Sequence, residues 1–159
     1  MTTNRAPWLK HGWMHQTQLI LRSFRHWLER DLISPAGDPE EIAQRLYEAP
    51  FVVVSHGTQA DPILNYGNQA ALTLWEMDAE TFLQTPSRQT AEPLHRDERA
   101  RLLERTTRDG YVDDYSGIRV SRAGRRFRID QAIVWNLLDE AGNPAGQAAT
   151  FHEWFRLGE

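Results

Sequence analysis

The chain contains no cysteine, and lysine occurs once among its 18 basic residues, at Lys10. Without cysteine the protein has no disulfide bond, no thiolate ligand for a metal and no cysteine nucleophile. Long apolar runs are also missing: none approaches the roughly 20 residues of a membrane-spanning helix, and the first residues lack the apolar stretch of a signal peptide. We therefore expect a cytoplasmic protein that does not associate with membranes.

Acidic and basic residues are unevenly distributed along the chain. Residues 33–95 carry nine acids and two arginines, whereas residues 96–128 carry ten arginines and six acids. A solvated helix and hairpin, balanced by acidic residues elsewhere in the fold, explain this distribution most simply. Because the whole chain has a net charge of -4 and a pI of about 5.9, we do not expect it to bind nucleic acid.

Residues 11–32 form the first predicted helix, because apolar side chains recur along one of its faces. This face contains Trp13, Ile20, Phe24, Trp27 and Leu28. Such a stripe is too apolar to remain in water, so the helix must fold back on its own sheet or meet a partner. We expect the second arrangement, in which two copies of the helix form the interface of a homodimer.

Short elements follow one another along the middle of the chain. Residues 51–55 are an uninterrupted β-branched run, typical of a strand covered on both faces, and a second short strand is expected at 63–66. Asp38 and Asn68 suit helix N-caps, and Gly110 suits the left-handed residue that ends a helix. The helices predicted from these signals span residues 39–48, residues 68 to 75 or 77, and residues 92–109.

The last third of the chain, residues 111–154, reads as three consecutive strands joined by turns at residues 123–124 and 142–144. Along the middle strand, residues of one parity are apolar and those of the other are charged, which predicts one apolar face. The apolar set is Phe127, Ile129, Ile133 and Trp135. We therefore expect Trp135 to be buried.

Several short motifs carry a resemblance to a known family. They are LNYGNQAAL at 64–72, PSR at 86–88 with AE at 91–92, YSGIR at 115–119, GRRFRI at 124–129, VWN at 134–136 and GQAATF at 146–151. With these motifs the chain resembles the MEKHLA family, a PAS-like domain that stands alone in bacteria and closes the C-terminus of plant class III homeodomain-leucine zipper factors. The resemblance, here to the stand-alone bacterial type, implies a sensory or regulatory role. It brings no established reaction, cofactor or catalytic residue.

The resemblance also implies an α+β fold with a PAS-like antiparallel five-stranded sheet, helices on one face and an N-terminal helical extension. Residues 1–50 are expected to be the extension and residues 51–159 the PAS-like domain, the two forming one folding unit. The strand at 51–55 is expected in the centre of the sheet, hydrogen-bonded both to 63–66 and to the last strand, 146–154.

Polar residues inside apolar segments are the candidate ligand contacts, because buried polar groups need partners. A concave pocket with aromatic walls and a few such groups would suit a small aromatic or carboxylate ligand. Arg88 is the candidate for a two-pronged pair with a carboxylate, either of the ligand or of Glu92. A purely structural network that holds the helices to the sheet is the alternative. The candidate residues are Tyr66, Trp75, Arg88, Tyr115, Arg128, Trp135, Asn136 and Gln147.

The histidines give little support for a cofactor, a metal or catalysis. His11 and His15 have helical spacing but no third ligand nearby. His95, near the helix that faces a PAS cavity, is weak support for haem, and His56 reads as a turn residue beside Ser55. The missing cysteine excludes a cysteinyl-flavin adduct and leaves a noncovalent flavin open. No acid, base and nucleophile come together, so we do not expect an enzyme.

Three functions follow from these observations. We expect a sensory or regulatory module that binds a small molecule in its core cavity and signals through a protein partner or through self-association. The alternative is a ligand-free dimerisation or protein-interaction domain. A small enzyme built on an α+β cone is the least favoured.

Overall fold

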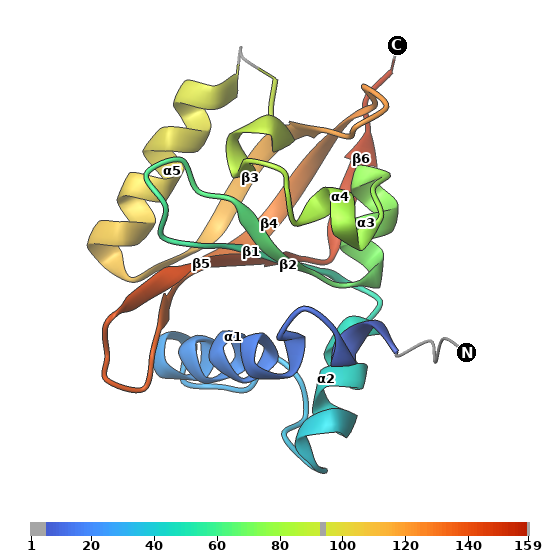
Figure 1. Ribbon diagram of the computed structural model, residues 1–159. Helices are drawn as coiled ribbons and strands as arrows, with labels where there is room; N and C mark the ends of the chain where they lie inside the picture. The colour runs from blue at the N-terminus through green and yellow to red at the C-terminus, as the bar shows by residue number, and fades with distance from the viewer. Residues whose placement is uncertain (1–5, 93–94, 159) are drawn as a thin grey trace.

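An antiparallel sheet lies between two groups of helices (Figure 1). The computed structural model describes residues 6–92 and 95–158. On one face lie η1 (Pro7–Leu9), α1 (Trp13–Leu28) and α2 (Pro39–Tyr47). On the other face lie α3 (Gln69–Trp75), α4 (Ala79–Phe82), η2 (Ser87–Thr90) and α5 (Arg96–Asp109). Within the described ranges, no helix has the length and apolar character needed to cross a membrane.

The strand order of the sheet is β2-β1-β5-β4-β3, with the short strand β6 also paired to β4. The strands are β1 (Val52–His56), β2 (Leu64–Gly67), β3 (Tyr111–Val120), β4 (Arg126–Leu138), β5 (Pro144–Phe151) and β6 (Glu153–Arg156). All pairs are antiparallel, and β1 lies between β2 and β5. The predicted α+β fold and the central position of the strand near 51–55 are confirmed.

The sheet has a sixth strand because the predicted last strand, 146–154, is interrupted. Ile133 pairs with Thr150, and Asp130 pairs with Glu153, so β5 and β6 keep the same register along β4. The ladder breaks between these pairs at Gln131, whose φ is 51°. A non-glycine residue with a left-handed backbone is uncommon, and here it divides one long strand into two.

The same backbone feature corrects the predicted apolar face of β4. Phe127 and Ile129 pack with the core on the α3 side of the sheet, whereas Trp135 and Leu137 pack with the core on the α1 side. Side chains alternate strictly only while the strand is regular, so an irregularity at Gln131 moves the following residues to the other face. Trp135 is fully buried, as predicted, but on the face opposite to Phe127.

Helix α1 covers the second face of the sheet with its apolar stripe. Trp13, Ile20 and Phe24 are fully buried in the chain itself. The indole Nε1 of Trp135 donates to the Ile20 carbonyl at 3.3 Å, and the Phe24 and Trp135 rings meet edge to face at 5.0 Å. Trp27 is half-buried, and its Nε1 donates to the carbonyl of a β4 residue at 2.9 Å. Of the two arrangements possible for this stripe, the structure shows the helix folded back on its own sheet, so no dimer is needed to bury Trp13, Ile20 and Phe24. The expected dimer interface, which also included Trp27 and Leu28, stays a prediction.

Three helix boundaries follow the predicted caps, whereas α5 begins at Arg96 and not at the predicted residue 92. Asp38 accepts from the Glu41 backbone N–H and completes a capping box at the start of α2. Asn68 accepts from the Ala71 backbone N–H at the start of α3. Gly110, with φ 94°, follows the last residue of α5. These caps fix where the helices begin and end, and therefore which of their side chains face the sheet.

Candidate functional site

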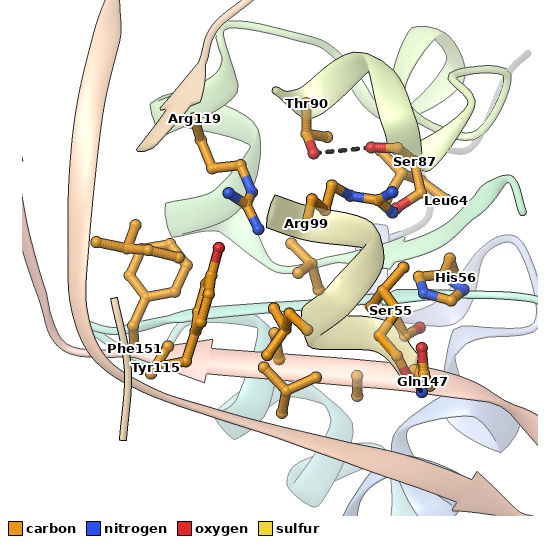
Figure 2. A pocket seen from close by; sticks show the side chains of 18 of the residues that line it. Ser55, His56, Leu64, Ser87, Thr90, Arg99, Tyr115, Arg119, Gln147 and Phe151 are labelled. Carbon is orange, nitrogen blue, oxygen red and sulfur yellow. Dashed lines mark hydrogen bonds between the residues drawn. The ribbon is translucent and has the colours of Figure 1, made fainter. Parts of the chain in front are cut away.

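A cavity of about 70 Å³ lies between α5 and η2 on one side and the sheet on the other. Its walls are mostly apolar, and they include side chains from α3, α4, α5 and strands β1 to β5. Among them are Leu64, Trp75, Leu102, Ile129, Val134 and Phe151. The apolar wall is interrupted by a few polar side chains, seen in Figure 2, and these decide what the cavity can bind.

Arg99 enters the cavity from α5 and is 8% exposed. Its guanidinium extends toward Ser87 of η2 and donates from Nη2 to the Ser87 hydroxyl (Figure 2). Ser87 is in turn held by η2, where Thr90 donates to the Ser87 carbonyl at 2.8 Å. Burial lowers the pKa of Arg99 to about 10, and the positive charge of Arg119 acts in the same direction. Arg99 therefore stays charged at neutral pH.

Arg119 and Tyr115 enter the cavity from β3. Arg119 is 6% exposed, and its guanidinium carbon lies 5.4 Å from the centre of the Tyr115 ring. The Tyr115 hydroxyl donates to Oε2 of Glu98 at 3.0 Å, and Nη1 of Arg119 lies 3.9 Å from the same oxygen. Burial raises the pKa of Tyr115 to about 12, so its hydroxyl remains a donor. A β-carbon at Gly117 would collide with the Tyr115 hydroxyl, which explains the glycine in the YSGIR motif.

His56 lies at the end of β1, on the opposite side of the cavity from Arg119 (Figure 2). Its Nδ1 is 3.0 Å from the Gly57 carbonyl, which can only accept, so Nδ1 carries the proton. Burial lowers the pKa of His56 and the charge of Arg99 adds to this shift, whereas the Gly57 carbonyl and the neighbouring Gln147 side chain oppose it. The neutral ring leaves Nε2 buried without a hydrogen-bond partner in the described part of the chain.

An amide pair closes one end of the cavity. Asn136 of β4 and Gln147 of β5 are cross-strand partners, and Nε2 of Gln147 donates to Oδ1 of Asn136 at 3.0 Å. Gln147 also donates to the Leu103 carbonyl at 3.2 Å, and Asn136 donates to the Thr106 carbonyl at 3.0 Å. Since these carbonyls belong to α5, the two amides fix the helix to the sheet.

The structure brings only some of the predicted ligand residues together. Trp75, Tyr115 and Gln147 line the cavity, and Asn136 contacts Gln147. The buried Nε1–H of Trp75 has no acceptor among the residues described. These four residues remain candidates for a ligand site.

The other four predicted residues lie elsewhere. Tyr66 and Trp135 pack on the α1 face, where the rings of Tyr66 and Trp13 are 4.9 Å apart. Arg88 is half-exposed and pairs with Asp61 at 3.2 Å, not with Glu92. Arg128 is half-exposed and pairs with Asp130 at 3.0 Å. The reversal at Gln131 explains Trp135. Arg88 lies on the exposed side of η2, whose Ser87 and Thr90 line the cavity.

Sequence reasoning missed Arg99 and His56. Arg99 belongs to an arginine-rich helix that suggested a solvated surface, yet its spacing of three from Leu102 and seven from Thr106 places it on the buried face. His56 was interpreted as a turn residue, although it is the last residue of a strand whose alternate residues, Val52 and Val54, face the same core. In both cases the periodic spacing of buried residues along the same helix or strand indicates that the side chain faces the core.

Comparison with solved structures identifies the fold as that of a PAS domain. The PAS domain of a protein from Colwellia psychrerythraea has a TM-score of 0.60 and 13% identity, covering 74% of this chain and 95% of that chain. A light-oxygen-voltage domain studied with a flavin analogue has a TM-score of 0.52 and 19% identity, covering 75% and 86%. An RNA-binding light-oxygen-voltage receptor has a TM-score of 0.58 and 17% identity, covering 79% and 35%.

Within this fold the chain belongs to the MEKHLA domain family, whose sequence profile matches residues 14–156. Homeobox-leucine zipper protein HOX10 of rice, Oryza sativa subsp. indica, is 22% identical over 136 residues. The HOX10 protein of Oryza sativa subsp. japonica gives the same values. The alignment covers 85% of this chain and 16% of each relative, so the chain spans about one sixth of their length.

Proposed function

We propose that this MEKHLA domain is a sensory or regulatory module that binds a small molecule in the cavity between α5 and the sheet. The observation that supports the proposal most strongly is a set of buried polar groups with unused hydrogen-bonding capacity. Nε2 of His56 and Nε1 of Trp75 are buried and unpartnered within the described residues, and both side chains line the cavity. Buried polar atoms in native proteins are rarely left unsatisfied, so a ligand or ordered water is expected to complete them.

The size of the cavity limits the ligand. Sites for drug-sized ligands have volumes of roughly 300–1,000 Å³, whereas this cavity has about 70 Å³. The cavity therefore does not fit a flavin, and the chain lacks the cysteine of a cysteinyl-flavin adduct. A ligand of a few heavy atoms fits this volume.

The output of the module is proposed to pass through α5. The cavity lies directly beneath this helix. The amides of Asn136 and Gln147 attach its C-terminal part to β4 and β5, and Glu98 in its first turn accepts from Tyr115 of β3. A ligand that contacts Arg99 and Leu102 would change how α5 sits on the sheet, and a protein partner or a second copy of the chain would detect that change.

Native mass spectrometry of freshly purified protein tests the proposal. We expect a bound mass in the wild-type protein that is lost in Ala149→Val, which adds two carbons at the sheet wall of the cavity. Ala145→Val is the matched control, because it makes the same change on β5 outside the cavity lining. Protein that carries no small molecule, and binds none from a metabolite mixture, favours the ligand-free interaction module instead. The same spectra report whether the protein is a homodimer.

A further inference from the structure

Two buried arginines share the cavity with little negative charge to balance them. Arg99 and Arg119 are both more than nine-tenths buried. Removing a guanidinium from water is costly unless a carboxylate or several acceptors compensate for the lost hydration. The contacts of the two side chains therefore indicate what is missing from the site.

The contacts provided by the protein are few. Among the described residues, Arg99, which has five N–H donors, donates one side-chain hydrogen bond, to the uncharged hydroxyl of Ser87. In the described part of the chain no carboxylate lies within ion-pair distance of Arg99. Arg119 donates to the Ile118 carbonyl at 2.9 Å and has one acidic neighbour, Glu98, at 3.9 Å. That carboxylate is more than one-third exposed and also accepts from Tyr115. Asp61 also acts on Arg99 through its charge, but it is exposed and pairs with Arg88, so the negative charge near the two buried arginines is largely solvated.

Of the two cavity atoms without a partner in the described part of the chain, Nε2 of His56 is an acceptor and is left to an ordered water, whereas the other is a donor, like the arginines. The indole N–H of Trp75 can only donate, and it is buried without an acceptor among the residues described. The unused N–H groups of Arg99, Arg119 and Trp75 need an acceptor that has several lone pairs and a negative charge. A carboxylate meets this requirement, and guanidinium groups bind carboxylates in a two-pronged geometry.

We propose that the cavity ligand is a small carboxylic acid anion with a short apolar body, held by Arg99 and Arg119. This inference rests on the proposed function, because it requires that the cavity binds a ligand. The apolar part follows from the walls, where Leu102, Ile129 and Phe151 offer no hydrogen bonds. The short length follows from the volume of about 70 Å³, well below the roughly 300–1,000 Å³ of sites for drug-sized ligands.

Titration calorimetry with propionate and its uncharged analogue propionamide tests the charge requirement. The two probes have nearly the same shape, so a difference reports the carboxylate. We expect propionate to bind at least tenfold more tightly than propionamide. Inorganic phosphate provides a third arm: binding as tight as that of propionate would show that the site takes oxyanions without an apolar body and would overturn that part of the proposal.

Variants of the arginines connect binding to the site. Arg99→Gln and Arg119→Gln are expected to weaken propionate binding at least tenfold, whereas Arg88→Gln, at a half-exposed arginine outside the cavity, is expected to leave it unchanged. Arg99→Gln also removes an uncompensated buried charge, so its melting temperature without ligand should not fall. If Arg99 had only a structural role, Arg99→Gln would instead lower the melting temperature. Should Arg119→Gln not fold, Arg119→Lys keeps the charge and tests the two-pronged geometry alone.

The outcomes separate this inference from the proposed function. Equal binding of propionate and propionamide, or full propionate binding by Arg99→Gln, overturns the carboxylate assignment. If native mass spectrometry then still shows a bound molecule that Ala149→Val loses, the cavity remains a ligand site for a neutral molecule. If neither experiment detects a ligand, the proposed function and the inference both fail.

Discussion

Replacing Asn68 with aspartate is predicted to destabilise the fold strongly although the two side chains have almost the same shape. Asn68 is fully buried where α3 meets β1. Its Oδ1 accepts from the backbone N–H of Val53 at 3.0 Å and of Ala71 at 3.2 Å. Its Nδ2 donates to the carbonyls of Phe51 at 2.8 Å and Leu46 at 3.2 Å. One amide therefore joins α2, β1 and α3.

The magnitude follows from the two donors that Asn68→Asp removes. Each buried carbonyl that loses its partner costs about 1–3 kcal/mol, so the carbonyls of Leu46 and Phe51 together cost about 2–6 kcal/mol. The new carboxylate also faces these oxygens in a buried site, which raises its pKa above that in the unfolded chain. The folded state then binds more protons than the unfolded state, so we expect the variant to regain part of its stability as the pH falls toward 4.

Urea unfolding followed by tryptophan fluorescence, at neutral and acidic pH, measures both effects. Asp78→Ala is the control, because it removes an exposed helix cap and should cost only about 1 kcal/mol. The reasoning would be refuted if Asn68→Asp were as stable as Asp78→Ala at neutral pH. It would also be refuted if acidification did not raise the stability of Asn68→Asp relative to the wild type.

Three further predictions concern stability. Trp135→Ala should cost about 3–5 kcal/mol in urea unfolding, because it empties a fully buried site beside Phe24; a loss below about 1 kcal/mol would contradict the packing. Arg88→Lys should change stability by less than about 1 kcal/mol and leave propionate binding intact, because Arg88 forms a half-exposed ion pair outside the cavity. Weaker propionate binding by this variant would show that Arg88 contacts the ligand. Burial lowers the pKa of His56, so the unfolded chain binds more protons below about pH 6.5 and stability falls with acidification; His56→Gln should flatten this part of a thermal-melting pH profile, and an unchanged profile would contradict a buried neutral ring.

The parts of the fold that could be predicted are those with local physical signals. The β-branched run of β1 predicted its central position, since a strand covered on both faces can be apolar on both. Asp38, Asn68 and Gly110 predicted the helix ends, because their side-chain oxygens or backbone freedom satisfy the ends of helices. Each of these features depends on a few neighbouring residues.

The parts that could not be predicted depend on distant or irregular features. Gln131 has a left-handed backbone although neither it nor its neighbours are glycine or asparagine, so the change of face before Trp135 had no local signal. The apolar stripe of α1 correctly predicted that this face is buried. It did not predict that the chain's own sheet, and not a partner, buries it. Arg99 was hidden because charged residues are almost never fully buried unless they are paired, and its proposed partner lies outside the sequence.

The most direct test of the cavity as a carboxylate site is a two-dimensional NMR spectrum of the arginine Nε–H groups during titration with propionate. Arg99→Lys and Arg119→Lys assign the two buried signals by their disappearance, and the signal of Arg88 provides an internal reference on the surface. We predict that propionate shifts the Arg99 and Arg119 signals in a saturable manner, that the Arg88 signal stays in place, and that propionamide shifts none of them. Signals of Arg99 and Arg119 that do not move at saturating propionate, or that move equally with propionamide, would contradict the account.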